Sequence, residues 1–143
     1  MVALLSALLL VGPAAGSADA IGKAKYEKQA RKATNAERQD EGLGKLRKNK
    51  CVQRFAVKQA RKMAKKQKLY HQDLDPVLEK CDLRTVGENV AYGYSDGKAV
   101  VKAWMGSPGH RANILHEDFR LLGMAARKSD DGRWYAAQVF GRK

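Results

Sequence analysis

The sequence predicts an α+β domain in which helices pack against an antiparallel sheet. Residues 49–68 carry apolar side chains at three- and four-residue steps, which is typical of an amphipathic helix. In the last third of the chain the pattern changes to alternation, in two segments that flank a turn at residues 129–132. Helices followed by a terminal hairpin are the arrangement of an α+β fold.

Residues 1–20 read as a secretory signal rather than as part of the domain. An apolar run at 2–11 is followed by Gly12-Pro13 and by small residues at 18–20, the pattern of a signal and its cleavage site. The run is too short to span a bilayer. No Lys or Arg precedes it, so the N-terminal amine supplies the positive charge or the chain starts upstream; a buried N-terminal helix is the alternative. We expect a secreted protein with one domain at 21–143.

The chain is strongly basic. It holds 28 Lys and Arg against 15 Asp and Glu, a formal charge of +13, and removal of residues 1–20 takes away one acid, Asp19. Such a charge attracts anionic surfaces. Outside a cell these are cell-wall polymers, the lipid headgroups of a membrane surface or acidic polysaccharides. Export argues against nucleic acid as a partner, and a solvated surface without a partner is the alternative.

Cys51 and Cys81 are the two cysteines of the chain. In an exported domain a single pair is expected to form a disulfide rather than a metal site or a reactive thiol.

Three further helical stretches are expected around the amphipathic one. Residues 23–41 lack Pro and internal Gly and precede Gly42 and Gly44, which end the helix. Residues 98–105 resume a helical pattern, and a further helix begins at Ser107. Between the amphipathic helix and residues 98–105, residues 69–97 hold Pro76 and several glycines and are expected to form a long irregular loop of functional importance.

The terminal hairpin is expected to pair residues 121–127 with 133–141. In the second strand two sets of residues alternate and should face opposite sides of the sheet: Trp134, Ala136, Gln138 and Phe140 in one set, and Tyr135, Ala137 and Val139 in the other.

The segment 104–115 places one histidine, His110, at the start of an expected helix. Ser107 is placed as the N-cap of a helix, with its hydroxyl bonded to backbone, and Pro108 as the first helical residue. His110 then lies on the first turn, where the helix dipole disfavours the imidazolium. Neutral imidazole binds metal or accepts a proton. A serine or cysteine protease is poorly supported, because Ser107 is occupied as a cap and no serine lies in a nucleophile elbow.

Two motifs resemble the CAP superfamily of cysteine-rich secretory proteins, venom antigens and pathogenesis-related proteins, in its bacterial exported branch. They are Gly87-Glu88-Asn89-Val90-Ala91 and, after Trp104, the segment 107–115 with the letters SPGHRANIL. Asn35, Arg38 and Leu46 are similar to the family's first-helix pattern, and residues 138–141 to its last strand. The resemblance covers about residues 30–141.

The resemblance implies an α-β-α sandwich with a central antiparallel sheet and an open cavity that gathers two histidines and acids. Carried over, His71 is the first histidine, Glu88 the acid and His110 the second histidine; Asn89, Trp104, Ser107 and Pro108 are structural. The acid that eukaryotic members carry on the helix with Trp104 has no counterpart here, since Met105-Gly106-Ser107 follows the Trp.

Two imidazoles and one carboxylate suffice for Zn²⁺ with a bound water, which a metal can turn into a nucleophile. His71 and His110 are therefore candidate ligands for a divalent metal. Glu88 has an alternative role, tying down backbone N–H groups of a loop. Tyr92 and Tyr94 line the cavity mouth or pack the loop, and His116 is expected at the surface.

We therefore expect a secreted, monomeric CAP protein without catalytic activity or a required cofactor. It would bind a ligand or an anionic cell-surface component through its cavity and basic helices. The alternatives are a metal-dependent extracellular hydrolase that uses His71, Glu88 and His110, and an extracellular binder of a small apolar ligand such as a lipid or sterol.

Overall fold

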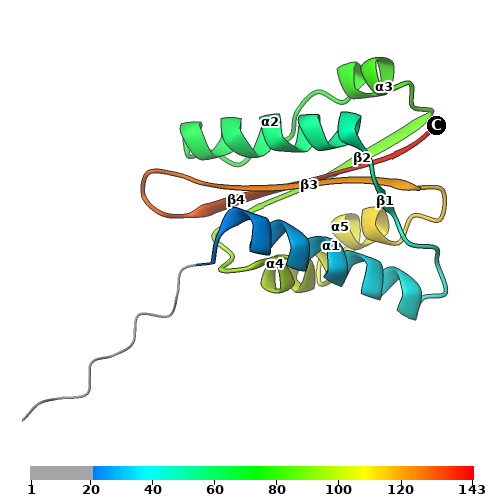
Figure 1. Ribbon diagram of the computed structural model, residues 1–143, viewed down its shortest axis with the longest axis horizontal. Coiled ribbons are helices and arrows are strands. Elements are labelled where there is room, and N and C mark those ends of the chain that lie inside the picture. The colour runs from blue at the N-terminus through cyan, green and yellow to red at the C-terminus, as the bar shows by residue number, and fades with distance from the viewer. Residues whose placement is uncertain (1–20) are drawn as a thin grey trace, which may run out of the picture.

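The computed structural model describes residues 21–143, so the predicted secretory signal lies outside the described residues. Five helices and four strands follow one another in this part of the chain: α1 (Lys23–Asp40), β1 (Arg47–Lys48), α2 (Lys50–Lys66), α3 (Asp75–Cys81), β2 (Thr85–Tyr92), α4 (Gly97–Met105), α5 (Pro108–Ile114), β3 (Leu121–Lys128) and β4 (Trp134–Arg142). They form three layers (Figure 1), with α2 and α3 on one face of the sheet and α1, α4 and α5 on the other. The α-β-α sandwich is confirmed.

The sheet has the strand order β1-β3-β4-β2. Strands β3 and β4 form the predicted hairpin, and β2 pairs antiparallel with β4 on its other side. The two-residue strand β1 pairs in parallel with β3. The antiparallel prediction therefore holds for the three long strands, whereas β1 is too short to leave a pattern in the sequence.

Both faces of β4 are buried, which explains its two alternating sets of apolar residues. Trp134, Ala136 and Phe140 belong to the core on the α1 and α4 side. Tyr135, Ala137 and Val139 belong to the core on the α2 side. The predicted stripe of α2, with Val52, Ala56, Ala60, Met63 and Ala64 buried, packs into this second core.

The expectation of an irregular loop over 69–97 is wrong, because α3 and β2 lie within it. Pro76 does not break a helix here; it stands in the first turn of α3, where its missing N–H costs no hydrogen bond. Strand β2 escapes a search for apolar alternation because Gly87, Glu88 and Asn89 in its centre are buried although they are not apolar.

The predicted disulfide is confirmed between Cys51, in the first turn of α2, and Cys81, the last residue of α3. It joins the two helices of one layer across a sequence separation of 30 residues. The segment that leads from α2 to β2 is thereby fixed at a second point.

A buried arginine holds the end of α5 against α1. The guanidinium of Arg38 donates hydrogen bonds to the carbonyl groups of Gly44, Ile114, His116 and Phe119. Burial, followed by the nearby charge of Arg120, lowers the pKa of Arg38. His116, expected at the surface, is half-buried by these contacts and by stacking on Phe119.

Candidate functional site

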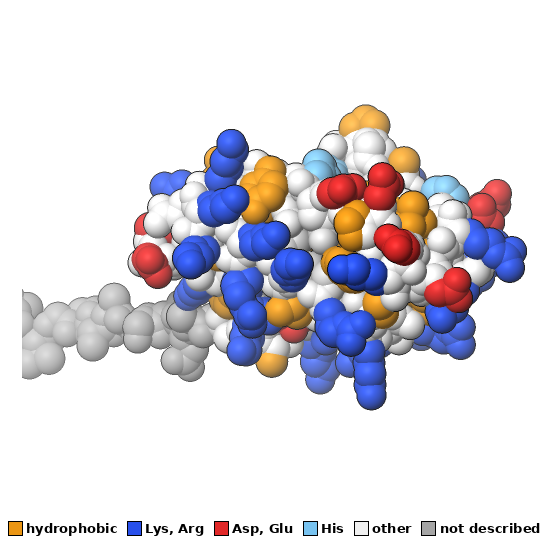
Figure 2. Space-filling model, turned by 90° about the horizontal axis from the view of Figure 1, so that it is seen from above, with side chains coloured by type: hydrophobic (Ala, Val, Ile, Leu, Met, Phe, Trp, Pro, Cys, Tyr) orange, Lys and Arg blue, Asp and Glu red, His pale blue; other side chains and the backbone are white. Residues whose placement is uncertain are grey.

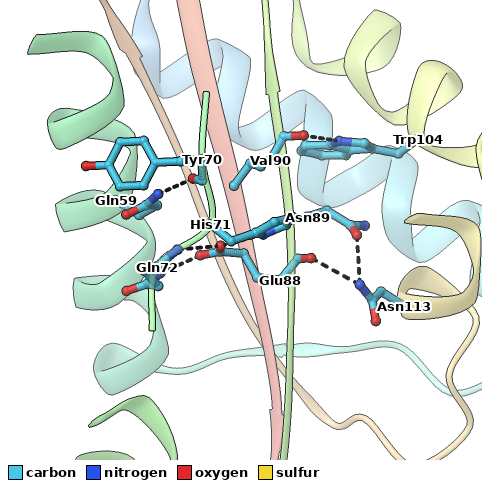
Figure 3. A network of polar contacts seen from close by, with 9 residues as sticks. All are labelled: Gln59, Tyr70, His71, Gln72, Glu88, Asn89, Val90, Trp104 and Asn113. Atoms are coloured by element: carbon cyan, nitrogen blue, oxygen red, sulfur yellow. Dashed lines mark hydrogen bonds and ion pairs between the residues drawn. The ribbon is translucent and has the colours of Figure 1, made fainter. Parts of the chain in front are cut away.

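The two polar residues at the centre of β2 serve two different segments. Successive side chains of a strand point to opposite faces of the sheet. Figure 3 accordingly shows Glu88 directed toward the segment that holds His71 and Gln72, and Asn89 toward Asn113 of α5. Strand β2 is thus the element that joins the two histidine-bearing segments.

Glu88 is the anchor of the His71 segment. Its carboxylate accepts hydrogen bonds from His71 Nδ1 at 2.8 Å, from the Gln72 backbone N–H at 3.1 Å and from Gln72 Nε2 at 2.5 Å. The Glu88 side chain is 1% exposed, whereas that of His71 is 59% exposed. Because the carboxylate accepts at Nδ1, the hydrogen of a neutral His71 is placed on that nitrogen and Nε2 is left as the accessible acceptor.

Helix α2 holds the same segment from the other side. Gln59, a buried residue of α2, donates from Nε2 to the Tyr70 carbonyl at 2.5 Å. The chain on either side of the His71 α-carbon is therefore fixed by a buried polar side chain, Gln59 before it and Glu88 after it. The position of the imidazole is set by the fold although the ring itself is solvent-exposed.

Asn89 leads to the second histidine through the backbone. Its Nδ2 donates to the His110 carbonyl at 3.1 Å and to Gln138 Oε1 at 3.3 Å. Gln138 in turn donates to the Thr34 hydroxyl of α1 at 2.7 Å. Thr34, Asn89 and Gln138 are all fully buried. A chain of polar contacts therefore runs from α1 across one face of the sheet to the start of α5.

Side chains of α4 and α5 cover the outer edge of β2. Asn113 Nδ2 donates to the Glu88 carbonyl at 3.1 Å and to Asn89 Oδ1 at 2.9 Å, and Trp104 Nε1 donates to the Val90 carbonyl at 3.2 Å. These bonds satisfy carbonyl groups that an edge strand would otherwise leave open to another chain. The expected structural roles of Asn89 and Trp104 rest on these contacts.

Gly87 is required by close packing at the same place. A Cβ atom on this residue would lie 2.9 Å from the Phe119 ring and 3.0 Å from Asn113 Oδ1. The three members of the Gly-Glu-Asn motif therefore play different roles. The glycine leaves space for the side chains of Phe119 and Asn113, the glutamate binds His71, and the asparagine binds the backbone carbonyl of His110.

His110 lies in the first turn of α5, as expected, and its pKa is lowered below the usual value for histidine. The larger cause is burial, and the second is repulsion from the charge that His71 carries when protonated. The direction is the one predicted from the position at the helix start, and burial and His71 are the causes that the structure adds.

The start of α5 differs in one detail from the expectation. Ser107 occupies the N-cap position and Pro108 the first turn, but the Ser107 hydroxyl makes no cap hydrogen bond. The helix instead begins with the Arg111 N–H donating to the Ser107 carbonyl at 2.8 Å. Pro108, which has no N–H to satisfy, reduces the need for a side-chain cap.

A pocket of about 220 Å³ lies beside His110. Leu69, Tyr92, Tyr94 and Trp104 line it together with the imidazole, and His71 and Glu88 do not. Within residues 21–143, no three His, Cys, Asp or Glu side chains are grouped so that they could hold a metal ion. Glu88 is bonded to His71 and Gln72, so the structure places it as a support for an imidazole and as the anchor of a backbone N–H.

The supporting residues Gln59, Gln72 and Thr34 carry no signal that singles them out in the sequence. Each is an ordinary polar residue whose partner lies in another element. Asn113 and Gln138 could have been found, because they belong to the segments 107–115 and 138–141 that already stand out.

The sequence profile of the Cysteine-rich secretory protein family (CAP) matches residues 31–140 of this chain. The Bacillus subtilis protein YkwD is 35% identical over 124 residues, which are 82% of this chain and 48% of YkwD. This chain spans about half or less of the length of the curated relatives it matches.

Two solved structures show the same fold. An extracellular protein of Bacillus anthracis that contains an SCP domain is 27% identical, with a TM-score of 0.73 over 85% of this chain and 41% of that protein. An outer surface protein of Borrelia burgdorferi is 21% identical, with a TM-score of 0.74 over 81% of this chain and 91% of that protein. In residues 21–143, no helix combines the length and the apolarity needed to cross a bilayer. The chain belongs to the CAP family of cysteine-rich secretory proteins.

Proposed function

We propose that this chain is an exported, non-catalytic CAP protein that attaches to anionic components of a cell exterior through the outer face of α2. The extracellular or outer-surface location of the two structural relatives and the signal-like residues 1–20 support export. The charge of α2 supports attachment, and it is the observation on which the proposal rests.

The outer face of α2 carries positive charges and no negative ones. All of its cationic side chains are exposed, and the helix contains no Asp or Glu; the cations are Lys50, Arg54, Lys58, Arg61, Lys62, Lys65 and Lys66. None of the ion pairs found in residues 21–143 involves them. Figure 2, which looks onto this layer, shows Lys and Arg side chains spread along it.

An unpaired cationic face of this kind fits a polyanionic surface better than a small neutral ligand. Charges that are exposed and free of carboxylate partners add to one another in the potential they create. Their attraction to an anionic surface is screened by salt over a Debye length of about 10 Å at 0.1 M. Binding through this face should therefore be strong at low salt and fall steeply as salt is added.

The state of Glu88 supports a non-catalytic function. A general base has to reach a proton on the substrate. The carboxylate of Glu88 is buried, and three hydrogen bonds to His71 and Gln72 occupy it. The helix with Trp104 adds no second acid at Met105, Gly106 or Ser107.

The test is co-sedimentation of the protein with vesicles of mixed neutral and anionic lipid, and with isolated cell wall, over a series of salt concentrations. We expect retention on at least one of these anionic materials at low salt and release as salt rises, with no retention on neutral vesicles. Retention that does not change with salt, or none at low salt, contradicts the proposal.

A second candidate is a divalent metal held by the two histidines. The observation that favours it is the orientation of His71: Glu88 binds Nδ1 and leaves Nε2 accessible, the arrangement found behind metal-bound imidazoles. Two nitrogens without a third protein ligand suit a weakly held ion such as Zn²⁺, with water completing the coordination. Calorimetric titration with Zn²⁺ should give one site that is lost in both His71→Ala and His110→Ala; binding unchanged in either variant excludes it.

A third candidate is a small apolar ligand. A groove of about 630 Å³ lies between α1 and α4, where Ala33, Ala36 and Val101 provide apolar walls. Native mass spectrometry of the purified protein would reveal a copurifying lipid. A spectrum with the mass of the bare chain, before and after incubation with fatty acid or sterol, excludes this function.

A further inference from the structure

The edge of the sheet at β1 carries two basic grooves that lie apart from the histidines. The first has a volume of about 440 Å³ and contains the cations Arg47, Lys48, Arg120, Arg142 and Lys143. The second has a volume of about 460 Å³ and contains Lys28, Arg31, Lys32 and Lys48. Lys48 lines both, so the two grooves meet at this residue.

The charge in these grooves is largely uncompensated. No acidic side chain lines either of them. Arg142 pairs with Asp118 at 2.8 Å, and Lys143 lies 4.0 Å from Asp82. In the part of the chain that the structure describes, no other cation of the two grooves has a carboxylate within ion-pair distance.

The fold explains why the two grooves flank one strand. Strand β1 is the outermost strand, it is two residues long, and both residues are exposed. Neighbouring side chains of a strand point to opposite sides. Arg47 and Lys48 therefore diverge, Arg47 into the first groove and Lys48 to the place where both grooves meet.

The chemistry of the lining indicates what the grooves can recognise. Neither contains an aromatic side chain, so bases or sugar rings find no surface on which to stack. What they offer is a series of ammonium groups and guanidinium forks, and the forks match the oxygens of phosphate groups. A thin chain with a negative charge on every repeat meets these conditions along its whole length.

We propose that the β1 edge is a binding track for a linear phosphate polymer, which crosses β1 at Lys48 and contacts both grooves at once. This inference rests on the proposed function, because both require attraction to anions. It goes further by assigning one part of the attraction to anions to a defined binding site, the two grooves at the β1 edge, which is separate from the outer face of α2.

The test compares two variants that lose the same charge from different places. The track variant carries Arg31→Gln, Arg47→Gln and Lys48→Gln; the α2 variant carries Lys58→Gln, Arg61→Gln and Lys62→Gln. In the described residues, none of these six side chains makes a hydrogen bond or an ion pair, so both variants should keep the fold, which circular dichroism checks. The probes are a short linear inorganic polyphosphate, orthophosphate and anionic vesicles, titrated at several salt concentrations.

We expect the wild type to bind polyphosphate and to bind orthophosphate far more weakly, because a single phosphate cannot span both grooves. The track variant should bind polyphosphate at least tenfold more weakly. Its slope of log K against log salt should decrease by about two, since each cation that pairs with a phosphate of a single-stranded polyanion accounts for about 0.7 of that slope. The α2 variant should lose less polyphosphate affinity and more vesicle binding.

Equal losses of polyphosphate binding in the two variants would overturn the track, because the overall positive charge of the protein would then account for the binding. The proposed function would still stand. The track would likewise be overturned, and the proposed function left standing, if the wild type bound vesicles but not polyphosphate. It would also be overturned if oligodeoxythymidylate with the same number of phosphates bound more tightly than polyphosphate. Failure to bind any of these probes at low salt would overturn the track, and if isolated cell wall also fails to retain the protein, the proposed function is contradicted as well.

Discussion

The Nδ1 atom of His71 lies 2.8 Å from Oε1 of Glu88, so the exposed imidazole of His71 is held by a buried carboxylate. The pair joins β2 to a segment without regular secondary structure. It fixes the direction of His71 without requiring that the ring be buried. The orientation of the ring and the stability of the fold should therefore both depend on this carboxylate.

Replacement of Glu88 by Gln should release the His71 ring and destabilise the fold. The amide offers one acceptor oxygen and places an NH₂ group where His71 or Gln72 already donates. An unsatisfied buried polar group costs about 1–3 kcal/mol, so the free energy of unfolding should fall by roughly that amount. Urea denaturation measures the loss, and ¹⁵N shifts of the imidazole measure the tautomer of His71.

The matched control is Glu79→Gln, an exposed acid on α3, which should change neither quantity. A His71 ring that keeps a single tautomer in Glu88→Gln would show that Glu88 does not orient it.

The stability of the protein should depend on pH through His110. Its pKa is lower in the folded state than the ordinary 6.5, so between these two values the unfolded chain binds more protons than the folded one. The stabilising contribution is complete above pH 6.5 and is lost as the pH falls through and below that value. Denaturation of wild type and His110→Gln at a series of pH values should give a steeper acid-side decline in the wild type.

The second cause of that shift is tested by NMR titration of His110. Because the charge of His71 contributes, His71→Gln should raise the pKa of His110 toward its ordinary value. A pKa that stays the same in this variant would show that the two rings do not interact.

Asn89→Ala should loosen α5 as well as destabilise the protein. The substitution removes the donor to the His110 carbonyl and leaves Gln138 and Asn113 each without one partner. We expect a loss of at least about 2 kcal/mol, since each buried orphan costs about 1–3 kcal/mol. Amide hydrogen exchange should accelerate in α5 more than in α2. Gln39→Ala, at an exposed position of α1, is the control, and uniform acceleration in both helices would speak against a local role.

Joint replacement of Cys51 and Cys81 by Ala should reduce the stability by about 3–4 kcal/mol, because the bridge closes a loop of about thirty residues in the unfolded chain. Chemical denaturation of the double variant and of reduced wild type should agree. A loss below about 1 kcal/mol in both would mean that native contacts between α2 and α3 make the bridge redundant.

The elements found correctly in the sequence are those with a period that packing imposes. The stripe of α2 and the two sets of β4 repeat because each faces a core, and the turn at 129–132 is set by its own residues. The centre of β2 escaped prediction because Glu88 and Asn89 are buried through hydrogen bonds rather than through apolar contact. A hydrophobic pattern contains no information about such pairs.

The sequence pointed to His71, Glu88 and His110 as candidate residues, but not to the polar side chains that hold them or to their geometry. The motifs around Glu88 and His110 indicated which residues belong together. They did not indicate that Glu88 would face His71 Nδ1, that the Ser107 hydroxyl would make no cap bond, or that burial would lower the pKa of His110. The environments of Glu88 and His110 depend on residues that are far away in the sequence, such as Gln72 and His71.

Attachment through the outer face of α2 is tested most directly by comparing two variants of equal net charge on anionic vesicles at low salt. One carries Lys58→Gln, Arg61→Gln and Lys62→Gln; the other carries Lys25→Gln, Lys98→Gln and Lys102→Gln, exposed cations of the opposite layer. We predict that the α2 variant loses most of its vesicle binding and the other retains most of it. Equal binding by the two variants would contradict the assignment of attachment to α2.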